Sequence, residues 1–332
     1  MRDLLWRESA DEMASTPRLF DRRVRPGPDR GPGPGAGGAP PVRKQAPGYY
    51  RMILGDFEVT TVSDGTIPQD FSENMTNTTP EEVRSLFARD REPLPTAASV
   101  NAFLINTGPK LVLIDAGAGT LFGPKVAGRL VTNLEAAGYR PDQVDAVLLT
   151  HLHGDHSPGL TVGGKVVFPN ATVYVNGREE EFWLSEAEAA KAPADRKPSF
   201  AQAREAIGPY LQAGRLKTFE GEAELFPGIR AWPRPGHTPG HTFYAVESRG
   251  QKLVLLGDTV HAAQVQFPRP DITIGYDVDP KAAADRRKRI FADASEEGYW
   301  VGAAHISFPG LGHIRRDGPG YAWIPATYRD LD

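Results

Sequence analysis

Seven consecutive residues, THLHGDH at positions 150 to 156, hold three histidines and one aspartate. The whole chain of 332 residues has only eight histidines, so this stretch concentrates side chains that bind metals. Imidazole and carboxylate are ligands that zinc and other divalent transition metals accept. Because the chain contains no cysteine, any metal site in it must be built from histidine and carboxylate.

The spacing within this stretch predicts places for two ions. It follows the apolar segment VDAVLL, which is typical of a buried strand that ends at a cleft. Side chains two residues apart on an extended chain point the same way, so His151 and His153 can converge on one ion. Gly154 permits a turn, after which Asp155 and His156 can face a second ion. The alternative is a polar loop whose imidazoles only form hydrogen bonds.

Three later segments also end an apolar run on a potential ligand: RPGHTPGH with His237, LLGDT with Asp258, and AAHISFPG with His305. Two sets of three ligands can then be assembled. The first set is His151, His153 and His237, and the second is Asp155, His156 and His305. Asp258 is the natural bridge, because the two oxygens of one carboxylate can hold two cations. We expect Asp155 and Asp258 to be catalytic.

The remaining sequence predicts strands interleaved with helices. Helices are expected over 80 to 90, with Thr79 as N-cap, over 124 to 138, and from Pro280 onward, with Asp279 as N-cap. This alternation favours an α/β fold in which helices enclose two sheets. The segment RPGPDRGPGPGAGGAPP is mostly glycine and proline, so residues 1 to 47 are predicted to be a disordered tail. The globular domain is expected over 48 to 332.

The charge balance excludes some classes of partner. A formal net charge of −4 gives no general basic field for nucleic acid or an anionic membrane surface. The sequence has no apolar run of about 18 or more residues and no apolar core of a signal peptide near its start. We therefore expect a soluble, cytoplasmic protein that acts on a small molecule, with a periplasmic or secreted location if translation begins elsewhere.

Together, THLHGDH, GHTPGH, GDT and AAHISFPG resemble the metallo-β-lactamase-fold hydrolases, over roughly residues 48 to 330. VNAFLINTGPKLVLIDAGAG and HISFPGLGH resemble the branch that contains methyl parathion hydrolase and its arylesterase and lactonase relatives. The resemblance implies a four-layered αββα sandwich with a binuclear metal centre between the sheets. It assigns the seven candidate ligands to the same two sets and the same bridge, and it suggests a homodimer.

Two divalent ions, most simply Zn²⁺ with Co²⁺, Mn²⁺ or Fe²⁺ as alternatives, would hold a bridging hydroxide as nucleophile. The expected reaction is hydrolysis of hydrophobic aryl esters, lactones or organophosphate triesters. A thioester hydrolase of the glyoxalase II type shares these motifs, but it would need a basic patch for its anionic thiol cofactor. A degenerate scaffold used only for binding is the non-enzymatic alternative, and it would have lost ligands.

Further residues are expected to lie around the metal centre without being ligands. Asp115 is a candidate acceptor that orients a ligand histidine, and His241 is expected beside the ligands rather than among them. His261 and His313 are predicted to be structural. By resemblance to the methyl parathion hydrolase branch, three aromatic residues are expected to line the pocket for the leaving group: Phe122, Trp183 and Phe200.

Overall fold

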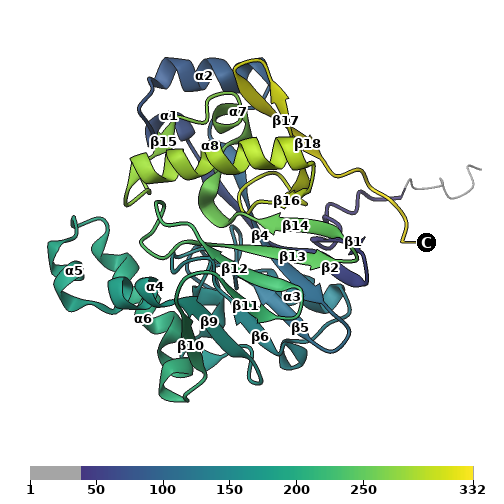
Figure 1. Ribbon diagram of the computed structural model, residues 1–332, viewed down its shortest axis with the longest axis vertical. Helices are drawn as coiled ribbons and strands as arrows, with labels where there is room; N and C mark the ends of the chain where they lie inside the picture. Colours follow the sequence, from purple (N-terminus) through teal and green to yellow (C-terminus); the bar gives the residue numbers. More distant parts are fainter. Residues whose placement is uncertain (1–38, 332) are drawn as a thin grey trace, which may run out of the picture. The chain divides into compact units, whose positions relative to one another are not determined.

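The computed structural model describes residues 39–331, and all of its helices and strands lie in the unit formed by Ala46–Asp332. Most of the predicted tail, residues 1 to 47, therefore lies outside the described residues. Within residues 39–331 the chain forms two seven-stranded sheets (Figure 1). None of the helices described there is both long and apolar enough to cross a membrane.

The first sheet has the strand order β1-β2-β4-β5-β6-β9-β10. Its strands are antiparallel from β1 to β5 and parallel from β5 to β10. Their bounds are β1 Tyr49–Leu54, β2 Phe57–Gln69, β4 Thr96–Asn106, β5 Leu111–Ile114, β6 Ala146–Leu148, β9 Thr172–Asn176 and β10 Leu216–Phe219.

The second sheet has the order β11-β12-β13-β14-β16-β17-β18. Only the pair β14 and β16 runs parallel. The bounds are β11 Ala223–Phe226, β12 Ile229–Pro233, β13 Thr242–Ser248, β14 Gln251–Leu255, β16 Trp300–Gly302, β17 Leu311–Asp317 and β18 Gly320–Pro325.

Short strands pair outside these sheets, β3 (Met75–Thr76) with β15 (Thr273–Ile274) and β7 (Thr161–Val162) with β8 (Lys165–Val166). The α-helices are α1 Phe71–Asn74, α2 Pro80–Arg89, α3 Leu130–Ala136, α4 Gly177–Leu184, α5 Glu186–Lys191, α6 Lys197–Gln212, α7 Ala263–Gln266 and α8 Pro280–Glu297. Single 3-10 turns are η1 Pro141–Gln143, η2 Pro158–Leu160 and η3 Gly257–Thr259.

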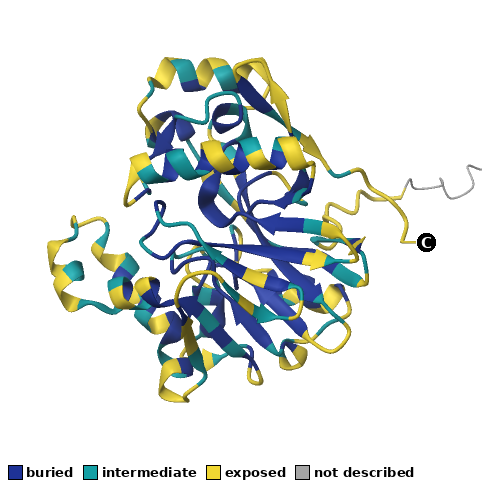
Figure 2. Cartoon of the chain, viewed as in Figure 1, coloured by how far each residue is buried: buried dark blue, intermediate teal, exposed yellow. Residues whose placement is uncertain are grey.

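Alternation along the strands creates the layers. On β5, Val112 and Ile114 belong to the core between the two sheets, whereas Leu111 and Leu113 pack with residues of α3, α4 and α6. On the second sheet, Phe243 and Val254 face away from the first sheet and pack with residues of α8. Figure 2 shows the buried strands between helices whose outer faces are exposed. The expected αββα sandwich is confirmed.

Two of the three predicted helices begin where the structure places them, and the third begins later. Thr79 and Asp279 cap α2 and α8, each with its side chain accepting a backbone hydrogen bond. The helix expected over 124 to 138 begins only at Leu130. Before it, Gly128 has a φ of 91°, a conformation that helices do not contain. Asp64 fixes this turn by accepting hydrogen bonds from the backbone N–H groups of Gly128 and Leu130.

The candidate ligands follow strand ends, as the sequence predicts. The stretch 150 to 156 begins two residues after β6, Asp258 lies in η3 beyond β14, and His305 follows β16. Because β14 and β16 are parallel, their carboxyl ends meet at the same edge of the second sheet. In the first sheet, β6 ends close to this edge of the second sheet. Both sheets therefore contribute candidate ligands to one place.

Candidate metal centre

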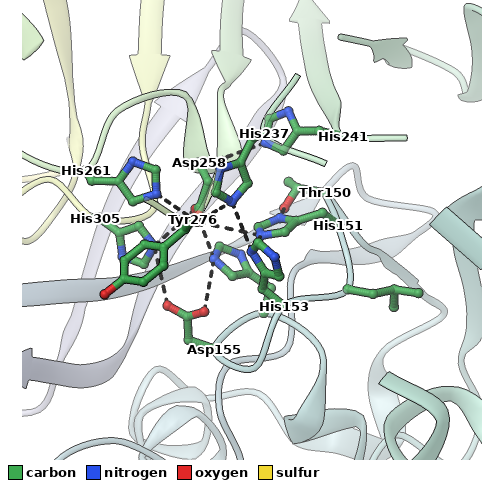
Figure 3. A network of polar contacts seen from close by, with 12 residues as sticks. Thr150, His151, His153, Asp155, His237, His241, Asp258, His261, Tyr276 and His305 are labelled. Atoms are coloured by element: carbon green, nitrogen blue, oxygen red, sulfur yellow. Dashed lines mark hydrogen bonds and ion pairs between the residues drawn. The ribbon is translucent and has the colours of Figure 1, made fainter. Parts of the chain in front are cut away.

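Three imidazoles converge on one point (Figure 3). Nε2 of His151 and Nε2 of His237 each lie 3.0 Å from Nδ1 of His153. Asp258 completes this cluster, with Oδ2 3.6 Å from Nε2 of His151 and 3.3 Å from Nε2 of His237. Metal–nitrogen bonds of about 2.0–2.1 Å in a tetrahedron place ligand atoms roughly 3.3 Å apart, so the cluster has nearly the size that a zinc ion requires.

A second cluster lies on the other side of Asp258. Nε2 of His305 is 3.4 Å from Oδ2 of Asp155, and Nε2 of His156 is 3.7 Å from Oδ1 of Asp155. Oδ1 of Asp258 lies 3.0 Å from Nε2 of His156 and 3.1 Å from Nε2 of His305. The two oxygens of Asp258 therefore face different clusters, which is the geometry of a bridging carboxylate.

The outer nitrogens of three histidines are already engaged. Nδ1 lies 2.8 Å from an acceptor in each: Asp115 for His156, Asp277 for His237, and the carbonyl oxygen of Ser99 for His305. This fixes the ring orientation and leaves the Nε2 lone pair facing the cluster.

Two buried atoms of the clusters, Nε2 of His156 and Oδ1 of Asp258, lie 3.0 Å apart but form no well-aligned hydrogen bond among the described residues. A buried polar atom left unpaired costs about 1–3 kcal/mol. A divalent cation would satisfy both atoms, and the donor set of imidazoles and carboxylates is one that such cations bind. The residues present therefore fit a metal centre.

Asp115 orients two of the histidines. Its carboxylate accepts hydrogen bonds from the backbone N–H and the hydroxyl of Thr150, each at 2.8 Å, as well as contacting His156. The Thr150 hydroxyl oxygen in turn lies 3.0 Å from Nδ1 of His151. Asp115 therefore contacts the candidate ligand His156 directly and reaches His151 through Thr150.

His241 lies beside the ligands and holds Asp258 in place. Its Nε2 accepts a hydrogen bond of 3.1 Å from the backbone N–H of Asp258. Burial and the neighbouring His237 lower the pKa of His241 to about 3, so this ring is a neutral acceptor. Gly257 allows the close approach, because a Cβ there would lie 2.6 Å from Nε2 of His241 and the residue has a φ of 49°.

Glu179 ties the two histidine loops together. From α4 its buried carboxylate accepts hydrogen bonds from the backbone N–H groups of Leu152, at 3.1 Å, and Gly240, at 2.7 Å, and from Nε1 of Trp183, at 2.8 Å. Burial raises the pKa of Glu179. Sequence reasoning missed this residue because nothing distinguishes it within the run REEEF.

The histidines of the two clusters differ in the direction of their pKa shifts. Burial and neighbouring histidines hold the pKa of His151 and of His153 well below the usual value, although Asp258 acts in the opposite direction. Burial alone would also lower the pKa of His156 and His237. For His156 the carboxylates of Asp258, Asp155 and Asp115 outweigh burial and raise the pKa, and hydrogen bonds to Asp258 and Asp277 raise the pKa of His237 to about 9.

Residues 95–294, more than half of the chain, match the metallo-beta-lactamase superfamily. The chain belongs to this superfamily. Among solved structures, hydrolase AbOPH of the beta lactamase superfamily is 39% identical, with a TM-score of 0.82, and the match covers 86% of this chain and 100% of that one. AidC, a dizinc quorum-quenching lactonase, is 26% identical, with a TM-score of 0.77 and coverage of 85% and 99%.

Curated relatives within the superfamily match over a shorter stretch. The N-acyl homoserine lactonase of Bacillus thuringiensis is 31% identical over 162 residues, which is 49% of this chain and 56% of that protein. The chain thus spans about half the length of the curated relatives that it matches. A ribonuclease of Thermus thermophilus is 30% identical over 184 residues, 52% of this chain and 38% of that protein. The two relatives are named for different substrates, a lactone and RNA.

In this member of the superfamily, a cavity of about 260 Å³ opens beside the two clusters and includes Asp155, Asp258 and His305 in its wall. Its other lining residues are in part apolar, as Ile67, Phe71 and Ala98 are, and in part polar, as Gln69, Arg196 and Tyr276 are. A second cavity of about 400 Å³ adjoins it and shares Phe71, Ala98, His261 and His305 with the first.

The aromatic residues expected in the pocket lie elsewhere. Trp183 and Phe200 are buried in the core outside the first sheet, with ring centroids 4.8 Å apart, and Phe122 is 40% exposed. None of the three is among the residues that line the 260 Å³ cavity. Trp183 still lies near the centre, since its ring is 5.2 Å from that of His153, but it packs behind this ligand.

Two further residues of the site were not found by sequence reasoning in their present roles. Asp277 was missed because it follows a two-residue strand, β15, that carries no clear periodicity. His261 was expected to be structural, but its Nε2 lies 3.3 Å from Oδ2 of Asp258. The signal that could have found His261 is its position three residues after the bridging aspartate.

Proposed function

We propose that the chain is a binuclear metal-dependent hydrolase that cleaves uncharged, hydrophobic substrates, namely aryl esters, lactones or organophosphate triesters. The observation that carries the proposal is the position of Asp258, whose two oxygens face the two ligand clusters beside a cavity. Such a carboxylate can hold two cations at once. The hydrolase relatives AbOPH and AidC, which match this chain over most of its length, support the same reading.

Each ion has its own protein ligands in this proposal. Zinc is the simplest choice for both positions, and cobalt, manganese or iron would fit the same donors. His151, His153 and His237 would hold the first ion, Asp155, His156 and His305 would hold the second, and Asp258 would contact both. When bound, a pair of divalent ions lowers the pKa of water and polarises a carbonyl or phosphoryl oxygen.

The protein's own contribution is orientation. Asp115, Asp277 and the Ser99 carbonyl keep three imidazoles turned toward the clusters, and His241 fixes the backbone of Asp258. Because these supports are buried, the ligand geometry exists before substrate arrives, so little reorganisation is needed at the moment of reaction.

The cavity wall favours neutral substrates. The cavity of about 260 Å³ is continued by the adjoining cavity of about 400 Å³, which gives space of the order of the ~300–1,000 Å³ typical of ligand pockets. Among the described residues that line the smaller cavity, Arg196 is the only lysine or arginine, and its Nε lies 3.9 Å from Oδ2 of Asp195. Aryl esters, lactones and organophosphate triesters share the required lack of charge. The methyl parathion hydrolase-like branch is proposed on this ground and on the sequence motifs.

The alternatives fit less well. A thioester hydrolase of the glyoxalase II type would need several cations to hold an anionic thiol cofactor, and the cavity wall offers only Arg196. A binding scaffold without catalysis would have lost ligands, whereas all seven candidates are present and face one another.

A kinetic panel on protein loaded with zinc, cobalt or manganese tests the proposal. The substrates are a nitrophenyl ester, dihydrocoumarin, an N-acyl homoserine lactone, methyl parathion and S-lactoylglutathione. We expect hydrolysis of the ester or of a lactone, at a rate that falls with metal removal and returns on reloading. Preference for S-lactoylglutathione would favour the thioester alternative. Fewer than two ions per chain and no hydrolysis of any substrate would favour the scaffold.

A further inference from the structure

His261 points into the centre but has no role in either ligand set. The residue is 5% exposed, and its backbone N–H donates a hydrogen bond of 2.7 Å to Oε1 of the buried Gln266, which fixes where the side chain starts. Nδ1 of His261 has no hydrogen-bond partner among the described residues, and Nε2 has only an ion-pair contact with Asp258. A buried imidazole without a well-aligned hydrogen bond is costly, so the ring is expected to bind something that comes from outside the chain.

The side chains nearest to the His261 ring, those of Asp258 and His305, are of types that bind cations. Figure 3 shows His261 beside His305, and the two rings are stacked with centroids 5.3 Å apart and an interplanar angle of 19°. Nε2 of His261 lies 3.3 Å from Oδ2 of Asp258, while Nε2 of His305 lies 3.1 Å from Oδ1 of the same carboxylate. Asp258, His261 and His305 offer ligand atoms that all lie within 4.8 Å of one another, so they form a third ligand group.

An ion cannot bind to this third group while another ion occupies the cluster of Asp155, His156 and His305. Nδ1 of His305 is engaged with the carbonyl oxygen of Ser99, so only Nε2 of His305 can bind a metal. A single lone pair serves one ion at a time. The cluster of Asp155, His156 and His305 and the cluster of Asp258, His261 and His305 are therefore two overlapping positions for the same ion.

His261 also lies where an ion would enter. It lines both the 260 Å³ cavity and the adjoining 400 Å³ cavity, whereas His156 lines neither and is only 1% exposed. Asp258, His261 and His305 all line the 260 Å³ cavity, whereas in the other position only Asp155 and His305 do, so the position that uses His156 is the deeper one.

Building on the binuclear centre of the proposed function, we propose that His261 is an alternate ligand of the second ion. The ion first binds to Asp258, His261 and His305 at the cavity wall. It then moves to Asp155 and His156 while His305 stays bound. The position formed by Asp258, His261 and His305 also holds the second ion when the position formed by Asp155, His156 and His305 is weakened. No bond of the substrate is involved, so the role is measured through metal binding.

The test compares cobalt binding, followed by visible absorption and by metal analysis after dialysis against a chelator. In the background Asp155→Ala, the second cobalt ion is expected to remain bound through His261. Adding His261→Asn should weaken the second ion at least about tenfold and leave the first unchanged. Adding His313→Asn instead is the matched control, since His313 belongs to none of the ligand groups, and it should change neither ion.

The first ion reports on folding, because a variant that unfolds loses both ions. Should the double variant fail in this way, the single variant His261→Asn decides, and we expect it to load the second cobalt ion more slowly in stopped-flow absorption. Equal affinities with and without His261, or an unchanged loading rate, would overturn the inference. A parent protein that binds fewer than two ions would instead overturn the proposed function.

Discussion

Nδ1 of His237 lies 2.8 Å from Oδ1 of Asp277, and both side chains are buried. The second oxygen of Asp277 accepts a hydrogen bond from the backbone N–H of Ile274. The backbone N–H of Val278 donates to the carbonyl oxygen of His237 at 2.9 Å. The connection between β15 and α8 is thereby attached to the loop that carries a candidate ligand, so the segment before α8 helps to position the candidate metal centre.

Replacing Asp277 with asparagine should weaken metal binding without unfolding the protein. The amide keeps the size of the carboxylate but loses the charge that stabilises the His237 N–H. Loss of such a partner typically lowers metal affinity by about 10–100-fold. Competition with a chromophoric chelator measures the change. Asp285→Asn is the control, because Asp285 pairs with the exposed Lys281 on the surface of α8 and belongs to none of the ligand groups. An affinity equal to that of the control would show that Asp277 does not position His237.

Replacing Glu179 with alanine should destabilise the fold. The change leaves the Leu152 and Gly240 N–H groups and Nε1 of Trp183 without their acceptor. At about 1–3 kcal/mol for each buried donor left unpaired, partly relieved by water, we expect a loss of about 3–5 kcal/mol in the free energy of unfolding. Denaturant unfolding measures it. Glu181→Ala, an exposed residue of the same helix, should change stability little. Equal stabilities of the two variants would contradict this role for Glu179.

Replacing Asp258 with alanine should abolish hydrolysis and release at least one ion. The carboxylate faces both clusters, so its loss removes a ligand from each. Metal analysis after gel filtration and the hydrolysis rate with the best substrate give the result, with Asp285→Asn again as control. If Asp258→Ala kept two ions and its activity, the bridging assignment would be wrong.

Metal affinity should rise with pH. Burial alone would lower the pKa of His237, but hydrogen bonds to Asp258 and Asp277 raise it to about 9, so in the metal-free protein a proton competes for this ring below that pH. An ion must displace the proton, and each displaced proton changes the apparent affinity about tenfold per pH unit. Zinc dissociation constants measured from pH 6.5 to 8.5 should therefore fall, with proton release on binding. Constants that do not vary over this range would contradict the assignment.

The sequence was informative wherever a ligand ends an apolar run. His151, His153 and Asp258 follow strands whose buried character is evident, so their meeting at the sheet edges could be predicted. The αββα layers followed from the same alternation. The helix expected over 124 to 138 was too long, because its apolar spacing hid the turn at Gly128 that Asp64 fixes through long-range hydrogen bonds.

Residues that act through tertiary contacts could not be predicted in this way. Asp277 and Glu179 reach the centre from a short strand end and from a helix, and local sequence does not say which buried carboxylate meets which loop. The residues that line the cavity could not be predicted from the sequence either. Trp183 and Phe200 are aromatic residues that pack in the core, whereas Ile67 and Phe71 line the cavity because of the way β2 and α1 lie beside the ligands.

Anomalous diffraction from crystals of the zinc-loaded protein is the most direct measurement of the central claim. We predict two peaks ~3.5–4 Å apart, one against each oxygen of Asp258, with the first among His151, His153 and His237 and the second beside His305. A single peak, or two peaks that do not share Asp258, would contradict the binuclear centre.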